Sequence, residues 1–139
     1  MDQDVLKEVR IQREVSQRSR TINYNFNIVF FRLSMSLLLP ILSWFGVLKY
    51  DENIGTWFSR SGSLMVLFAL LAEVKLFKID GLTKPVSENG LTYADLGVRD
   101  QLYLRYSKPI SRWKFITMGL AVCGTIIWGY GDLIWKFFH

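Results

Sequence analysis

The sequence predicts an all-α membrane protein with three transmembrane helices, an amphipathic cytoplasmic N-terminal helix and a small cytoplasmic loop region. Three observations predict this class. Half of the 139 residues are apolar, 15% are aromatic and the mean hydropathy is positive, which is unusual for a soluble domain of this length. The apolar residues gather in three segments that charged stretches separate. Lysine and arginine alternate between these stretches as three membrane crossings require.

Residues 1–27 are expected to form the amphipathic cytoplasmic segment. Asp2 and Asp4 stand at its start, where the helix dipole favours acidic groups. Apolar residues then alternate with lysine, arginine and glutamate: Val5, Leu6, Val9, Ile11 and Val15. Two interpretations stay open, because the apolar stripe is imperfect. The helix either continues the first span into the cytoplasm as a solvated rod, or it self-associates or lies on the membrane surface.

Residues 28–48 and 115–135 are long enough to cross a hydrocarbon core, which takes about 20 apolar residues. The middle segment, 54–77, reaches that length only if it includes Arg60 and Glu73. Its rival interpretation is a segment in the interface or within protein, which leaves two spans. A cleaved signal peptide is disfavoured for the first segment, because acids and bases mix before it and no small-residue cleavage site follows.

The charge distribution predicts the orientation of the chain. Residues 1–27 carry five lysines or arginines, 49–56 carry one and 73–114 carry eight. Because short loops rich in lysine and arginine stay on the cytoplasmic side, we expect a multi-pass protein of the bacterial inner membrane. Its N-terminus and residues 78–114 are expected in the cytoplasm, and its C-terminus outside.

Residues 78–114 form the predicted basic and aromatic loop. Turn residues open it, with Asp80 before Gly81 and Lys84 before Pro85. Five apolar residues follow: Ala94, Leu96, Val98, Leu102 and Leu104. Their spacing fits a short helix or a half-buried strand. About 35 residues cannot bury a large core alone, so the loop is expected to fold against the N-terminal helix, a neighbouring subunit or a partner.

The end of this loop interleaves cations with aromatic rings. The residues concerned are Arg99, Tyr103, Arg105, Tyr106, Lys108, Arg112 and Trp113. A positively charged flank with interfacial aromatics is one explanation. The other is a contact site for anionic lipid, nucleic acid or a nucleotide signal, because rings stack on bases while cations meet phosphates. The sequence contains neither a P-loop nor a G-x-G-x-x-G motif.

Catalytic chemistry has little support in the sequence. Cys123 is the single cysteine and His139 the single histidine, so no disulfide within the chain and no Cys/His metal cluster can form. Histidine-based catalysis is disfavoured because His139 is the terminal residue. We therefore expect no enzyme, no cofactor and no metal site.

Ionisable residues lie inside the predicted spans. Arg60 and Glu73 are thirteen residues apart, about 20 Å along a helix and roughly 220° around it, so they cannot pair within one helix. The topology places Arg32 and Glu73 in the inner leaflet, and Arg60 and Asp132 in the outer one. We predict the ion pairs Arg32 with Glu73 and Arg60 with Asp132, within a chain or between copies. The alternative is that each side chain reaches the interface independently, which is hardest for Glu73 because it leans toward the membrane centre.

Small residues in the spans predict close helix packing. Serines and glycines of the second and third spans, Gly62 and Gly131 among them, let helices pack closely, and the candidates singled out for packing are Ser59, Ser63, Gly119, Cys123 and Gly124. Ser59 with Ser63, and Gly119 with Cys123, have the small-xxx-small spacing that lets membrane helices approach closely. The alternative is that small and polar residues line a pore. Pro40 is expected to kink the first span.

Two short runs carry a resemblance to known proteins. Residues 57–67 (WFSRSGSLMVL), followed by 73–75 (EVK), and residues 128–133 (WGYGDL) resemble small multi-span membrane proteins of bacteria. The function of those proteins is unknown, but some accompany anti-phage defence modules as transmembrane effectors. The likeness covers the second and third spans. For such an effector, it implies growth arrest or death by membrane disruption after a phage signal.

Two functional hypotheses follow. The first is a small oligomeric inner-membrane protein that forms a pore, such as an ion channel, or perturbs the membrane, controlled through its cytoplasmic face. Several copies would be needed, because one chain is too short to enclose a pore. The second is a non-catalytic membrane anchor or assembly subunit that recruits a protein partner. The expected partners are membrane lipid, further copies of the chain, and a nucleotide, nucleic-acid or protein signal at the cytoplasmic face.

Overall fold

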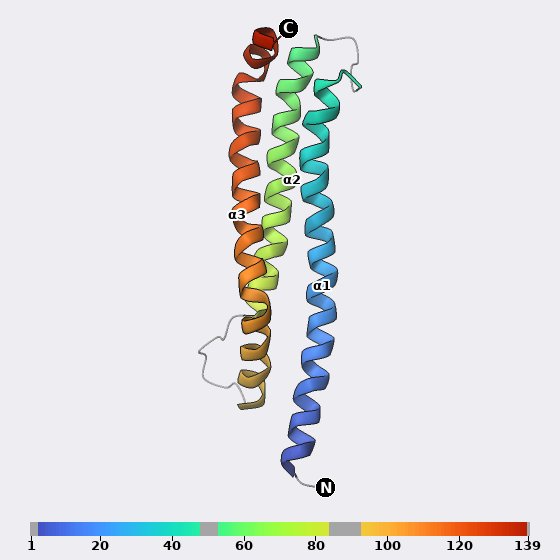
Figure 1. Ribbon diagram of the computed structural model, residues 1–139, viewed down its shortest axis with the longest axis vertical. Coiled ribbons are helices and arrows are strands. Elements are labelled where there is room, and N and C mark those ends of the chain that lie inside the picture. Colours follow the sequence, from blue (N-terminus) through green and yellow to red (C-terminus); the bar gives the residue numbers. More distant parts are fainter. Residues whose placement is uncertain (1–2, 48–52, 84–92, 139) are drawn as a thin grey trace.

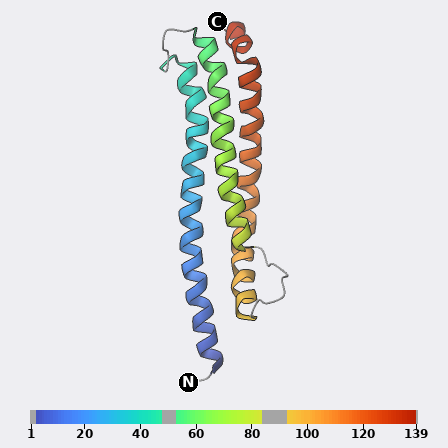
Figure 2. The same ribbon diagram turned by 180° about the vertical axis from the view of Figure 1, so that it is seen from behind.

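Three long helices make up nearly all of the residues that this computed structural model describes, which are 3–47, 53–83 and 93–138. They are α1 (Gln3–Trp44), α2 (Ile54–Thr83) and α3 (Tyr93–Phe138), with no strand in these ranges. The all-α prediction is therefore confirmed. α2 lies between α1 and α3 in both views (Figures 1 and 2), and it runs antiparallel to them. The starts of α1 and α3 thus share one end of the bundle, called here the N-terminal end.

Local chemistry sets the ends of α1 and α2 near the opposite, C-terminal end. Gly46 has a φ of 70°, and its N–H donates to the Ser43 carbonyl while the Val47 N–H donates to the Leu42 carbonyl, each at 3.1 Å. This pair of bonds is a Schellman motif, in which glycine supplies the left-handed residue that ends a helix. α2 begins after Asn53, whose carbonyl accepts from the first turn at 3.0 Å and 3.3 Å, as an N-cap residue does.

The region expected as a loop is mostly helical. Residues 78–83 belong to α2 and residues 93–114 belong to α3. The turn expected at Asp80 and Gly81 is therefore helical, and of the helix and the strand left open for the later apolar positions, the helix is formed. The third span is likewise the continuation of α3 and not a separate helix over 115–135. A stripe of buried residues explains the helix: Val98, Leu102, Tyr106 and Ile110. Their spacing of four fits a helix and not a strand; residues 84–92, with the predicted turn at Lys84 and Pro85, lie outside the described ranges.

The main apolar core lies in the N-terminal half of the bundle and takes side chains from all three helices. α1 contributes Ile22, Val29 and Leu33, α2 contributes Ala72, Leu76 and Ile79, and α3 contributes Val98, Leu102, Tyr106 and Ile110. Ile11 and Val15, from the predicted amphipathic segment, pack against this core. The expectation that the region after residue 78 folds against the N-terminal helix is therefore confirmed.

Two of the three helices, α1 and α3, are long and apolar enough to cross a membrane. α2 does not meet the same test, so the prediction of three such helices is confirmed only for two. The reason lies in its sequence, where Glu73, Lys75, Lys78 and Asp80 follow closely on the most apolar stretch. With 42 and 46 residues, α1 and α3 are about 63 and 69 Å long. Both are roughly twice the 30 Å thickness of a hydrocarbon core.

Candidate functional site

α2 and α3 approach each other most closely where glycines face backbone atoms. A Cβ atom on Gly62 would lie 2.5 Å from both the Gly124 carbonyl oxygen and the Trp128 backbone nitrogen. A Cβ on Gly124 would lie 2.9 Å from the Gly62 carbonyl oxygen, and one on Gly131 2.8 Å from the Ser59 Cα. Ser59 Oγ donates a 2.7 Å hydrogen bond to the Trp128 carbonyl. We call these five residues the glycine contact; it is the packing device that membrane helices use, since small residues let backbones approach.

The sequence identified part of the glycine contact. Ser59 and Gly124 were predicted to pack helices and do so here. Gly62 and Gly131 were not paired with them. A spacing of seven residues, which repeats from Gly55 to Gly62 and from Gly124 to Gly131, was the signal that could have found them, because such residues share a helix face.

Three predicted packing residues lie outside this contact. Ser63 is exposed, and its hydroxyl donates to the Arg60 carbonyl of its own helix at 2.7 Å. A Cβ on Gly119 would meet no atom within 4 Å, and Cys123 is exposed. The spacing of Gly119 and Cys123 therefore does not mark packing within the described part of the chain. Ser63 lies at the edge of the α2–α3 contact, where it lines a pocket with Val66, Thr125 and Trp128.

Arg32 and Glu73 do not form the predicted ion pair within the chain. Arg32 Nη1 donates instead to the Leu71 carbonyl of α2 at 2.5 Å. Glu73 follows Leu71 by two residues, which turns it about 200° around the helix and away from Arg32. Glu73 is half-buried, and it has neither a hydrogen bond nor an ion pair among the residues that the structure describes. Pairing between copies stays a prediction.

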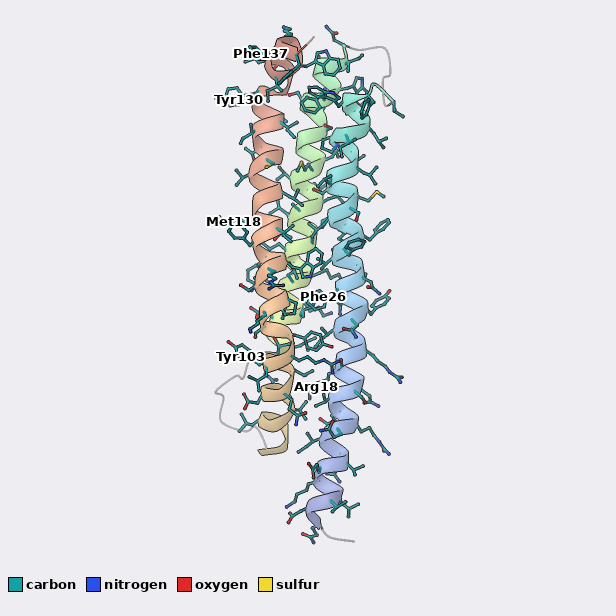
Figure 3. All side chains as sticks on the ribbon, viewed as in Figure 1. Arg18, Phe26, Tyr103, Met118, Tyr130 and Phe137 are labelled. Carbon is teal, nitrogen blue, oxygen red and sulfur yellow. The ribbon has the colours of Figure 1, made fainter. Side chains whose placement is uncertain are left out.

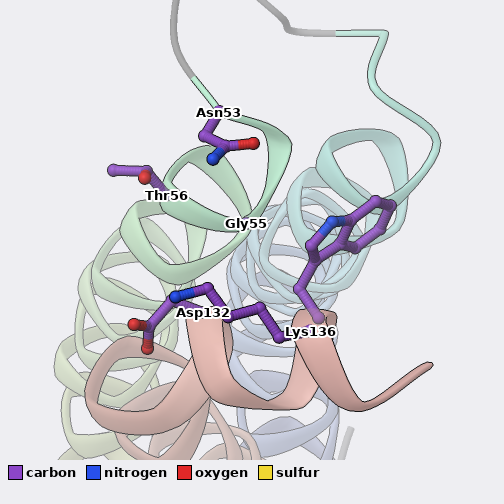
Figure 4. A pocket seen from close by; sticks show the side chains of 6 residues that line it. Asn53, Gly55, Thr56, Asp132 and Lys136 are labelled. Atoms are coloured by element: carbon purple, nitrogen blue, oxygen red, sulfur yellow. The ribbon is translucent and has the colours of Figure 1, made fainter. Parts of the chain in front are cut away.

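The second predicted pair is also not formed between the described side chains of Arg60 and Asp132, which are both exposed. Asp132 lines a pocket of about 370 Å³ at the C-terminal end of the bundle, shown in Figure 4. The other lining residues are Asn53, Gly55, Thr56, Trp135 and Lys136. Asp132 thus faces the start of α2, which lies before Arg60 along the helix.

An ion pair that the sequence did not suggest links α2 to α3. Lys114 Nζ lies 2.7 Å from Asp80 Oδ2, and the side chains are 30% and 13% exposed. The ammonium also lies 4.9 Å from the centroid of the Phe77 ring, which is within the range of a cation–π contact. Asp80 was interpreted as a turn residue, and its place inside α2 lets it meet α3.

The seven residues predicted to contact a ligand or lipid are divided between two sides of α3. Tyr106 is buried and turns to α1, where its hydroxyl lies 2.5 Å from Ser19 Oγ and donates to Asn23 Oδ1 at 3.2 Å. Trp113 is half-buried, with its ring 6.3 Å from that of Phe30 in an edge-on arrangement. Arg99 is half-buried, whereas the other four are exposed: Tyr103, Arg105, Lys108 and Arg112. The structure therefore does not gather all seven at one site.

Part of this set borders a groove between α1 and α3. Its volume is about 530 Å³, and it is lined by Asn23, Phe26, Asn27, Phe30, Tyr106, Pro109 and Trp113. Figure 3 shows Phe26 between the helices, in contrast to Met118 and Tyr130 on the outer side of α3. We call it the α1–α3 groove; the described part of its lining combines aromatic rings with two carboxamides and includes no acidic residue.

No family model, curated protein or solved structure matches the chain. The resemblance to bacterial transmembrane effectors therefore stays a prediction. Among the described residues, no group of three histidine, cysteine or acidic side chains is placed to hold a metal ion.

Proposed function

We propose that the protein is a small oligomeric protein of the bacterial inner membrane that forms a pore or perturbs the membrane, controlled through its cytoplasmic face. α1 and α3 supply two helices able to span, and α2 would cross between them. Arg60 and Glu73 would then each lie about 5 Å inside the hydrocarbon core, since about 20 Å of helix separates them. The N-terminal end of the bundle would be cytoplasmic, because it carries most of the lysines and arginines.

The observation that carries this proposal is an unoccupied face of small residues on α3. Among the described residues, no atom beyond the neighbouring backbone of its own helix lies within 4 Å of the Gly119 Cβ position, and Cys123, one turn further, is exposed. Gly119 lies five residues before Gly124, which places it about 140° around the helix from the glycine contact. Because small-xxx-small faces associate with other helices in membranes, a second copy of the chain is the occupant that we propose.

Glu73 supports the same proposal. This half-buried carboxylate has no hydrogen bond or ion pair among the described residues. A carboxylate within a membrane is costly unless a partner or water surrounds it. Assembly of several copies would supply either a cation from a neighbouring chain or a water-filled path.

Cys123 makes the oligomer directly testable, because it is the only cysteine of the chain. Mild oxidation of membranes containing the full-length protein is expected to give a disulfide-linked dimer. Gly119→Leu should abolish this product, whereas Gly129→Leu, an equal change at another open position of α3, should leave it intact. A dimer yield that is the same for both variants would contradict association through this face.

Membrane activity is tested separately, in liposomes that hold a fluorescent ion indicator. Ion flux is expected to rise more steeply than in proportion to the amount of protein, because several copies form the active unit. Glu73→Gln should change the flux if that carboxylate lines the path. An absence of flux at every protein-to-lipid ratio would exclude the pore.

A second candidate, the anchor or assembly subunit, is favoured by the free end of α1. Ile11 lies beside Gly97, near the start of α3, and the residues before it expose Val5, Leu6 and Val9 to about half of their surface. Apolar residues clustered at an exposed helix end suit a protein partner. Photo-crosslinking from position 9 in cells separates the candidates, because an anchor predicts a different protein as the product.

A further inference from the structure

Two grooves lie between α1 and α3, at different heights along the bundle. The α1–α3 groove is nearer the N-terminal end. A second groove of about 340 Å³ lies nearer the C-terminal end, lined by Pro40, Ile41, Trp44, Phe45, Phe58 and Ile127. Among the described residues, this second lining has no charged side chain. The two grooves therefore differ in chemistry: one offers amides and rings, and the other offers apolar surface.

The two grooves lie on the same side of α1 and α3. We call this side, from Phe30 and Trp113 to Trp44 and Ile127, the seam. On α3, Trp113 of the first groove and Ile127 of the second are separated by two steps of seven residues, with half-buried Leu120 between them. On α1, Phe30 and Trp44 are likewise fourteen residues apart. Residues seven apart drift by only about 20° around a straight helix. The grooves therefore follow the same side of both helices.

The length of the seam matches one leaflet of a bilayer. Phe30 in the first groove and Pro40 in the second are ten residues apart, which is about 15 Å along a helix. Half of a hydrocarbon core of roughly 30 Å is the same distance. A molecule with a polar head and an apolar chain of leaflet length would thus reach from one groove to the other.

Cations flank the polar end of the seam. The Arg105 guanidinium carbon lies 5.8 Å from the centroid of the Tyr106 ring, which lines the groove. Arg112 follows Pro109 by three residues, so it lies on a neighbouring edge of α3. The described residues of the lining include no acidic side chain, so the charge at this end suits a phosphate group, which arginine binds through paired N–H donors.

We infer that the seam binds one anionic glycerophospholipid, with its phosphate head in the α1–α3 groove and an acyl chain along α1 and α3 toward the second groove. The inference rests on the proposed membrane location. A nucleotide shares the phosphate but has no apolar chain for the rest of the seam, so the lipid is the better fit. Bound lipid would contact α1 and α3 along the seam, and Phe58 of α2 at the second groove.

The test uses the full-length protein in a neutral detergent. Native mass spectrometry is expected to show one phosphatidylglycerol retained per chain, and little phosphatidylcholine at the same concentration. Added phosphatidylglycerol should also raise the unfolding temperature, as any ligand of the native state does. Inorganic phosphate and adenosine monophosphate should not raise it.

A pair of double variants locates the site. Arg105→Gln with Arg112→Gln is expected to weaken phosphatidylglycerol binding at least tenfold. Arg10→Gln with Arg13→Gln removes the same charge from exposed positions of α1 at least ten residues before the groove, and should change binding less than twofold.

Three results would overturn the inference: equal retention of phosphatidylcholine, an equal loss in both double variants, or stabilisation by the soluble phosphates that matches that of the lipid. Lipid binding can fail while Cys123 still forms the dimer, so this outcome is distinguishable from failure of the proposed function.

Discussion

Replacing Gly62 by alanine is the sharpest test of how α2 and α3 pack. The new Cβ would lie 2.5 Å from two backbone atoms of α3 and 3.0 Å from a third. Backbone atoms cannot rotate away as a side chain can. Since ordinary contact begins at 3.4 Å, and 3.4 minus 2.5 is 0.9, the two helices must separate locally by about 1 Å.

The size of the effect follows from three contributions. Overpacking of this kind costs about 1–3 kcal/mol. The hydrogen bond from Ser59 to the Trp128 carbonyl would lengthen, and such a bond contributes about 0.6 kcal/mol between membrane helices. Alanine recovers about 0.5–1 kcal/mol, because it is the better helix former. We therefore expect Gly62→Ala to lower the free energy of unfolding by about 2 kcal/mol.

The same substitution at other glycines provides a graded control. Gly124→Ala and Gly131→Ala meet their nearest atoms at 2.9 Å and 2.8 Å, so each should cost about 1 kcal/mol. Gly81→Ala and Gly129→Ala meet nothing within 4 Å and should be neutral or slightly stabilising.

The measurement is reversible unfolding by dodecyl sulfate in mixed micelles, followed by tryptophan fluorescence and far-ultraviolet circular dichroism. Close packing at Gly62 is refuted if the free energy of unfolding of Gly62→Ala lies within about 0.5 kcal/mol of that of Gly129→Ala, since neutral surface changes stay within this range.

Three further predictions concern polar contacts between helices, each measured by the same unfolding titration. Ser36→Ala removes a buried 3.0 Å hydrogen bond from α1 to α2 and should lower the free energy of unfolding by about 1 kcal/mol. Ser63→Ala should be neutral, because the exposed hydroxyl of Ser63 bonds within its own helix. Equal losses of stability in the two variants would refute the role of the Ser36 bond. In a double-mutant cycle, Asp80→Asn and Lys114→Gln should show a coupling of about 1 kcal/mol, and strictly additive effects would mean that the 2.7 Å pair contributes nothing. Tyr106→Phe removes the hydroxyl bonded to α1 and should cost about 1 kcal/mol with an unchanged helix content, so full native stability would argue against that bond.

The apolar pattern was sufficient to predict an all-helical chain and two of its long apolar segments. It did not distinguish a helix from a strand over residues 93–114. The apolar positions there include exposed residues, Leu96 and Leu104, as well as buried ones, Val98 and Leu102. Only packing against α1 and α2 selects the stripe that repeats every fourth residue. Burial by a neighbouring helix is a tertiary effect, and a single sequence does not display it.

The prediction of ion pairs within the chain was wrong for a different reason. The predicted topology put Arg32 and Glu73 at similar heights, and Arg32 does reach α2 beside Leu71, two positions from Glu73. Two side chains at the same height meet only if they lie on facing sides of their helices. The rotation of each helix about its axis sets those sides. The glycine contact, by comparison, could be partly predicted, because the small size of Ser59 and Gly124 lets another helix backbone approach them closely.

The unbroken course of α3 has a mechanical consequence. Tyr93 to Phe138 form one helix about 69 Å long. Pro109 lies inside it and lacks the N–H of one backbone hydrogen bond, so the hydrogen bonds of the other turns hold the two halves in one rod. A tilt of roughly 5° about one end would displace the other end by about 6 Å over that length. A molecule that binds the start of α3 and tilts the helix would therefore also displace Trp128 and Gly131, which lie near its other end.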